Sequence, residues 1–298
     1  MTCSPSSFCD FLDVTYSPVD CPYPELNLLL LGAGFIVRRD TGGCVVYVPP
    51  TERGVAKVTH SSKFAKISLS GGVCEALRAA GLWEEALSIL GTSPHKVTRL
   101  DAALDLPFDA ADVIASLRAR YPEGKVNLGR KALPVSVMLS MRDDGRESGT
   151  YYVGHRTAAR MTCRVYDKTL EALSKRGEKL PTTTRFEVTA RKDSGATLRD
   201  AAMPSSLFWH IASPALLSRP EGIPMWAPNT EMGYTAPTRT FEPAETLRRR
   251  VESSAELEAF LAVADAMGDK GRDYLLSLVE SRFFPERRQA KREALKRA

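Results

Sequence analysis

Short stretches of alternating apolar and polar residues run through the first two thirds of the chain and predict β-strands. Gly, Pro or Asp bounds each stretch, as is typical of strands in hairpins. Amphipathic stretches with helical spacing lie between them. The expected strands are 44–48, 64–69, 97–106, 135–141, 149–153, 161–166 and 184–190. The expected helices are 73–80, 83–90, 110–121, which Asp109 could cap, and 169–175.

The order of these elements predicts an α+β fold with a largely antiparallel central sheet, helices packed on one face, and a helical C-terminal appendage. Residues 1–24 are rich in Ser, Pro and Cys, and we expect them to pack loosely. The main domain is expected over 25–240, ending in a proline-rich linker or ordered loop. Residues 241–298 are expected to form a basic helical region.

The composition is that of an ordinary globular protein, with 298 residues, 43% apolar and 26% charged. Six cysteines occur without a C-x-x-C pair, which argues against a zinc site and a small disulfide framework. No apolar run approaches the roughly 20 residues needed to cross a bilayer. The N-terminus has neither the basic nor the apolar region of a secretory signal. We therefore expect a cytoplasmic protein that does not bind membranes.

The positive charge is concentrated at the C-terminus. Residues 281–298 hold seven Arg and Lys against two Glu, while the net charge of the whole chain is +5. A basic tail on a neutral body is typical of an arm that binds nucleic acid or an acidic partner. A solvated helix end explains the same charge equally well.

Three of the predicted strands place charge on one face and apolar residues on the other, because side chains alternate across a strand. Solvent-facing strands are often polar, but strands disfavour Asp, so two Asp on one face indicate a site. Together such faces could bind a phosphodiester and a divalent cation. The polar positions are Arg99, Asp101, Asp105, Arg164, Tyr166, Lys168, Arg185, Glu187, Thr189 and Arg191.

Five motifs follow one another along the chain: G-G-x-C-E-A-L (71–77), T-R-L-D-A-A-L-D (98–105), Y-Y-V-G-H-R (151–156), C-R-V-Y-D-K-T-L-E (163–171) and R-F-E-V (185–188). In this order they resemble the replication initiation factor family. Its members are trans-acting initiators of rolling-circle plasmids, replication proteins of filamentous phages and some relaxases of conjugative elements. The resemblance covers roughly residues 60 to 240.

The resemblance implies a bacterial enzyme that nicks one strand at a double-stranded origin through a tyrosine, which falls on Tyr166. The product would be a 5′-phosphotyrosyl intermediate and a free 3′-hydroxyl primer. The resemblance also implies an acidic divalent-metal site, which falls on Asp101, Asp105 and Glu187. Oxygen ligands favour Mg²⁺ or Mn²⁺ over zinc. The implied partners are origin DNA with a single-stranded or cruciform nick site, a host helicase, and a second copy of the chain.

The chemistry of the site limits these roles. A phenol has a pKa of about 10, so Tyr166 needs help to attack at neutral pH. Arg164 and Lys168 lie about 7 Å away along an extended strand and are expected to favour the phenolate or to hold the phosphate. Asp101 and Asp105 would be about 13 Å apart on one strand, so Glu187 is expected to join only one of them, and which one stays open.

Two alternatives share this interpretation of the chain. A relaxase acting at a transfer origin would use the same site, and a non-catalytic DNA-binding regulator could use the same scaffold. Tyr151 and Tyr152 are rival nucleophiles, of which one is expected to face the core and the other could stack on a base. The basic residues expected to contact DNA are Arg99, Arg156, Arg185, Arg191, Arg287, Arg288, Lys291 and Arg292.

Overall fold

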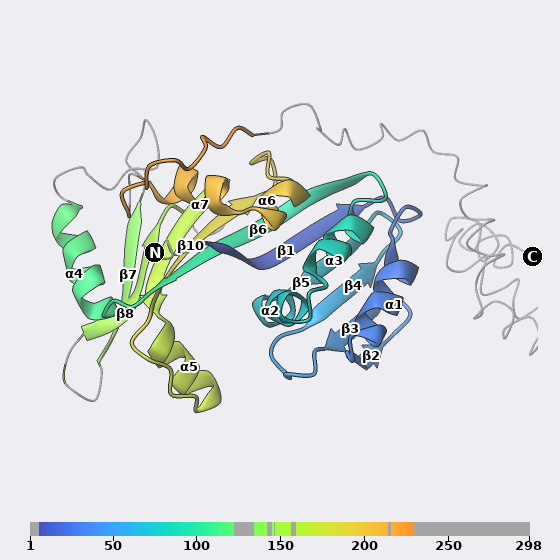
Figure 1. The fold of residues 1–298 in the computed structure, drawn as a ribbon, viewed down its shortest axis with the longest axis horizontal. Coiled ribbons are helices and arrows are strands. Elements are labelled where there is room, and N and C mark those ends of the chain that lie inside the picture. Colours follow the sequence, from blue (N-terminus) through green and yellow to red (C-terminus); the bar gives the residue numbers. More distant parts are fainter. Residues whose placement is uncertain are drawn as a thin grey trace, which may run out of the picture. The chain divides into compact units, whose positions relative to one another are not determined.

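A ten-stranded antiparallel sheet forms the centre of the part of the chain that the computed structural model describes, residues 6–121, 134–141, 145, 147–155, 159–213 and 216–228. The strand order is β2-β3-β4-β5-β1-β6-β10-β9-β8-β7 (Figure 1). The strands are β1 (Phe8–Tyr16), β2 (Ile36–Asp40), β3 (Cys44–Val48), β4 (Ala56–His60), β5 (Ala65–Leu69), β6 (His95–Leu106), β7 (Val135–Met141), β8 (Glu147–Val153), β9 (Met161–Asp167) and β10 (Thr184–Arg191).

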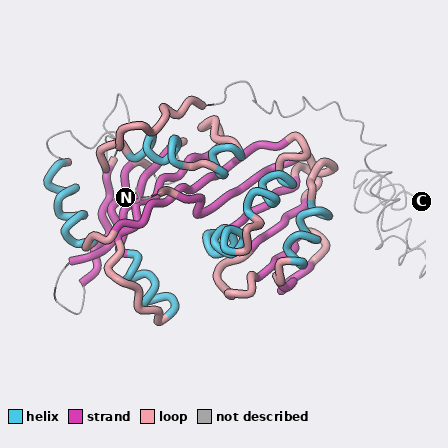
Figure 2. The backbone as a smooth tube through the Cα atoms, in the orientation of Figure 1, coloured by secondary structure: helices cyan, strands magenta, loops and turns pink. Residues whose placement is uncertain are grey.

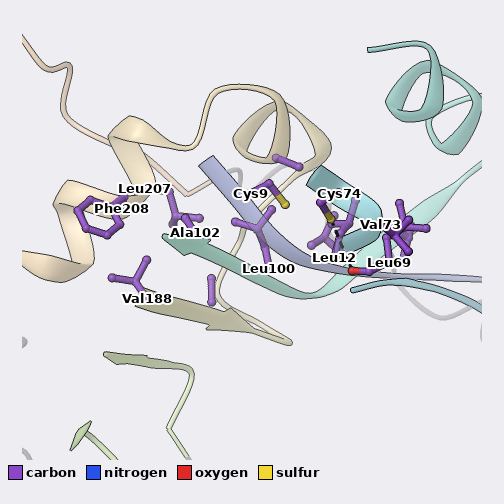
Figure 3. Close-up of a cluster of buried hydrophobic side chains, with 14 of the residues drawn as sticks. Cys9, Leu12, Leu69, Val73, Cys74, Leu100, Ala102, Val188, Leu207 and Phe208 are labelled. Carbon is purple, nitrogen blue, oxygen red and sulfur yellow. Dashed lines mark hydrogen bonds between the residues drawn. The ribbon is translucent and has the colours of Figure 1, made fainter. Parts of the chain in front are cut away.

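Helices cover one face of this sheet, and the core lies between the two layers (Figure 2). Leu12, Leu100 and Val188 project from three strands of that face and are fully buried. Figure 3 shows them beside Val73 and Phe208 of the covering helices. Helix α5 lies beside the opposite face. The helices are α1 (Tyr23–Gly32), α2 (Gly71–Ala79), α3 (Trp83–Leu90), α4 (Ala110–Arg120), α5 (Lys168–Arg176), α6 (Leu198–Ala202) and α7 (Ser205–Ala212).

The predicted fold class is confirmed for the described part: α+β, with an antiparallel sheet and helices packed on one face. All seven predicted strands and all four predicted helices occur, with ends that differ by two residues at most. Asp109 caps α4 as expected, since its Oδ1 accepts a hydrogen bond from Ala111 N at 2.8 Å. No helix among the described residues is long and apolar enough to span a membrane. The expected appendage over 241–298 lies outside the described residues.

The expectation that residues 1–24 pack loosely is wrong for residues 8–16. They form β1, which lies between β5 and β6 near the middle of the sheet. Leu12 and Val14 are fully buried there. The Ser, Pro and Cys that flank β1 suggested a loose segment, but pairing on both sides and burial of alternate residues outweigh local composition.

Gly72 of α2 packs closely against the segment before β4. A Cβ on Gly72 would lie 2.0 Å from the carbonyl oxygen of Arg53, so α2 would have to shift. We expect Gly72→Ala to lower the free energy of unfolding by about 1–3 kcal/mol. Gly32→Ala is the control, because a Cβ there meets nothing within 4 Å and alanine favours helix. Urea unfolding measures both, and equal effects would contradict the packing argument.

Candidate active site

The polar face of the sheet gathers charged side chains where β6, β10 and β9 lie side by side. Arg185 of β10 pairs in register with Asp105 of β6 and with Tyr166 of β9. Two residues further along β10, Glu187 pairs with Arg164 of β9. Directly paired residues and residues two apart on a strand share a face. The structure therefore brings these five predicted site residues to one surface.

Tyr166 is held in a buried, positively charged setting and is only 7% exposed. Its hydroxyl donates a hydrogen bond to Glu187 Oε2 at 3.4 Å. The Arg164 guanidinium lies 5.0 Å and the Lys168 ammonium 5.9 Å from the ring centroid. Burial raises the pKa of Tyr166 well above its usual value, and Glu187 adds to the rise. Arg185 and Arg164 lower this pKa, which for Arg164 agrees with the expectation that neighbouring cations favour the phenolate, but the effect of burial is larger.

Lys168 reaches Tyr166 from a helix, which corrects the prediction that it shares the strand face. β9 ends at Asp167, and Lys168 is the first residue of α5. Asp167 Oδ1 caps this helix by accepting a hydrogen bond from Leu170 N at 2.8 Å. Lys168 Nζ is bound to Glu171 at 2.7 Å. The helix cap therefore determines where the lysine lies.

Glu187 is the most deeply buried acid of the site, at 1% exposed. Burial raises the pKa of its carboxyl to about 7, although Arg164 Nη2 donates a 2.6 Å hydrogen bond to Oε2 and lowers it; the charge of Asp101 raises it further. Oε1 has no hydrogen-bond partner among the residues that the structure describes. A buried carboxylate oxygen without a partner is costly, so this atom is a position for a proton or a cation.

The two predicted aspartate ligands are held by different arginines. Arg99 binds Asp101 through Nε–Oδ1 at 3.0 Å and Nη2–Oδ2 at 2.5 Å. Arg185 binds Asp105 through Nε–Oδ1 at 2.6 Å and Nη2–Oδ2 at 2.7 Å. Both arginines were expected to contact DNA. In the structure their guanidinium groups bind protein carboxylates.

Asp10 is a site residue that the sequence analysis missed. It lies at a register shift of β1, between Cys9 and Phe11, and its Oδ1 accepts a hydrogen bond from Arg185 Nη1 at 3.0 Å. Burial raises the pKa of Asp10, and Arg185 partly opposes the rise. An aspartate between two apolar residues could have indicated Asp10 as a site residue, but the strand that contains it, β1, was not predicted.

The acids fit a divalent cation only in part. No group of three or more His, Cys, Asp or Glu in the described ranges is arranged to hold a metal ion. Mg²⁺, however, often binds through one or two carboxylates together with water and substrate phosphates. The orphan Oε1 of Glu187 fits such a site.

Tyr166 lines two cavities despite its low exposure. The larger cavity, of about 1040 Å³, extends from Tyr166 to the N-terminal end of α2. The smaller, of about 310 Å³, lies against β8, β9 and α5. A ligand can therefore approach the tyrosine from two sides. Both cavities are lined by Arg164, Tyr166, Glu171 and Lys175.

The remaining predicted DNA contacts lie elsewhere or outside the described residues. Arg191 pairs with Arg99 at the far end of β10 from Tyr166. Tyr151 is fully buried, as expected of one of the two adjacent tyrosines, whereas Tyr152 is half-buried. The residues outside the described part are Arg156, Arg287, Arg288, Lys291 and Arg292.

Comparison with known proteins was made with the sequence and with the fold. No protein-family model and no curated protein sequence matches the chain. The di-domain ARO/CYC BexL of the BE-7585A biosynthetic pathway aligns over 71% of this chain and 99% of its own, with 12% identity and a TM-score of 0.18. A rolling circle replication initiator protein from Geobacillus stearothermophilus aligns over 74% of this chain and 89% of its own, with 16% identity and a TM-score of 0.49.

Proposed function

We propose that the protein is a rolling-circle replication initiator that nicks one strand at a double-stranded origin with Tyr166 as nucleophile. One observation carries the proposal: the Tyr166 hydroxyl is hydrogen-bonded to a buried carboxylate where two cavities meet. Arg164 and Lys168 lie 5.0 Å and 5.9 Å from the centroid of the Tyr166 ring and could bind the scissile phosphate. A nucleophile, a base and cations in one place are what phosphodiester transfer requires.

In the proposed reaction, Tyr166 Oη attacks the phosphorus and Glu187 Oε2 accepts the phenolic proton. A base with a pKa near 7 suits this transfer at neutral pH. A bond forms between Tyr166 Oη and the 5′-phosphate, the P–O3′ bond breaks, and the departing 3′-oxygen takes a proton from water. Attack by a 3′-hydroxyl on the phosphotyrosine reverses these steps, so strands can be rejoined without ATP.

Mg²⁺ or Mn²⁺ at Glu187 Oε1 would neutralise charge on the phosphate in the transition state. Asp101 is the proposed second ligand, because its charge acts on Glu187. Arg99 would then have to share Asp101 with the ion.

The test is to incubate the full-length protein with Mg²⁺ and supercoiled DNA that carries the cognate origin. We expect relaxed DNA and a covalent protein–DNA adduct, with the nucleotide mapped by mass spectrometry to the peptide that contains Tyr166. An adduct on Tyr152 would refute the nucleophile assignment. Binding of the origin without any cut in Mg²⁺ or Mn²⁺ would support the non-catalytic regulator instead.

Substitution of two helix caps distinguishes an effect on the position of Lys168 from an effect on protein stability. Asp167→Ala and Asp109→Ala each remove an Asp cap, of α5 and α4 respectively, and each loss of a cap should lower the free energy of unfolding by about 1 kcal/mol. Asp167→Ala should cost somewhat more, because Asp167 Oδ2 also accepts a 3.1 Å hydrogen bond from Ser148 Oγ. Only Asp167→Ala should also slow nicking, by about tenfold, because α5 carries Lys168 to the tyrosine. Urea unfolding and a gel assay of nicked DNA measure the two effects. Equal nicking rates in the two variants would contradict this role of α5.

A further inference from the structure

The two cavities that meet at Tyr166 differ about threefold in volume, at 1040 Å³ and 310 Å³. The site therefore has unequal room on its two sides. Ligand pockets typically have volumes of about 300–1,000 Å³, and the two cavities lie close to the two ends of this range. A base can enter such a space only when it is unpaired and out of the helical stack.

The wall of the smaller cavity suits a single base. Tyr152 of β8 pairs in register with Arg164, and Thr150 pairs with Tyr166, so this wall lies directly beside the proposed nucleophile. The Tyr152 ring is half-buried. Aromatic rings in such positions stack on unpaired bases regardless of their identity.

The wall of the larger cavity suits a longer piece of strand. Arg53 and Arg176 line it, and both bind Glu178, at 2.9 Å and 3.0 Å. This links the segment before β4 to the segment after α5. Glu178 occupies the place on these two guanidinium groups that a backbone phosphate would take.

Resting on the proposed nicking function, we infer that an unpaired DNA strand crosses Tyr166 with unequal flanks. About one nucleotide lies in the smaller cavity and about three lie in the larger, in proportion to their volumes. Tyr152 stacks on the base of the short flank. Arg53 and Arg176 bind phosphates of the long flank once Glu178 is displaced.

The test measures the affinity of full-length Tyr166→Phe protein, which cannot form the adduct, for labelled single-stranded oligonucleotides that span the nick site. Each end is shortened one nucleotide at a time. We expect the affinity to fall on one side only when the nucleotide next to the nick is removed. On the other side of the nick, the affinity should fall with the removal of each of the about three nucleotides nearest the nick. Equal losses on both sides would overturn the inference.

Variants assign the flanks to the cavities. Tyr152→Ala should weaken binding about tenfold when the short flank is present and not when it is absent, and Tyr152→Phe should retain the affinity. Arg53→Ala should weaken binding of the long flank, and Glu178→Gln should strengthen it, each about fivefold. If the change in affinity in each variant is the same whichever flank the oligonucleotide carries, the inference is overturned.

The outcome for the inference is separate from that for the nicking function. An adduct on Tyr166 of the wild type together with equal flank losses refutes only the unequal flanks. Absence of an adduct with every oligonucleotide refutes the proposed function.

Discussion

Tyr166→Phe is expected to abolish the covalent adduct and to lower the nicking of supercoiled origin DNA by at least about 10³-fold. The change removes only the hydroxyl, the group that would form the bond to phosphorus. The ring keeps its buried position near Arg164 and Lys168, so the fold and DNA binding should persist. Because the lost hydrogen bond to Glu187 is long, at 3.4 Å, we expect the free energy of unfolding to change by less than about 1 kcal/mol.

Tyr152→Phe is the matched control for the nucleophile. This substitution also removes one phenolic hydroxyl, from a tyrosine on the neighbouring strand β8. Tyr152 and Tyr166 both line the smaller cavity. The Tyr152→Phe variant should retain the adduct. Denaturing gels show the adduct, agarose gels show the relaxed DNA, and a binding assay shows that both variants still hold the origin. An adduct that persists in Tyr166→Phe would sink the nucleophile assignment.

Arg185→Met is expected to give the largest loss of stability, about 3–5 kcal/mol in the free energy of unfolding. Arg185 is 8% exposed, and its guanidinium binds Asp105 and Asp10 and lies 5.1 Å from the Phe8 ring centroid. It thereby joins β10 to β6 and β1. Methionine keeps an unbranched chain but leaves two partly buried carboxylates without the arginine that pairs with them.

A second substitution and a surface control separate charge from packing in this network. Adding Asp105→Asn to Arg185→Met should recover part of the lost stability, since it removes one of the uncompensated charges. Arg53→Met removes an arginine whose side chain is 41% exposed and should change stability by less than about 1 kcal/mol. Urea unfolding measures all three proteins. A loss in Arg185→Met no greater than in Arg53→Met would rule out the network as a stabilising feature.

Much of the fold could be predicted because strand and helix patterns are local. The alternation in 97–106, 161–166 and 184–190 depends only on the pleat of a strand. It identified both the strands and the side chains that share a face. The same local pattern failed for β1, in which the alternation is broken at Asp10 and Phe11 and which is flanked by Ser, Pro and Cys. Asp10 was missed together with its strand.

The sequence by itself determined the α+β class, the strands of the site, and the face that carries Tyr166, Arg164 and Glu187. Only the tertiary structure decided which carboxylate each arginine binds, because that depends on the register between strands far apart in the chain. It also decided the direction in which the pKa of Tyr166 shifts, since burial among distant elements outweighs the charge of Arg164, its neighbour in sequence. The two cavities also depend on the tertiary structure, because β8 and α2, which form parts of their walls, are brought beside the tyrosine only by folding.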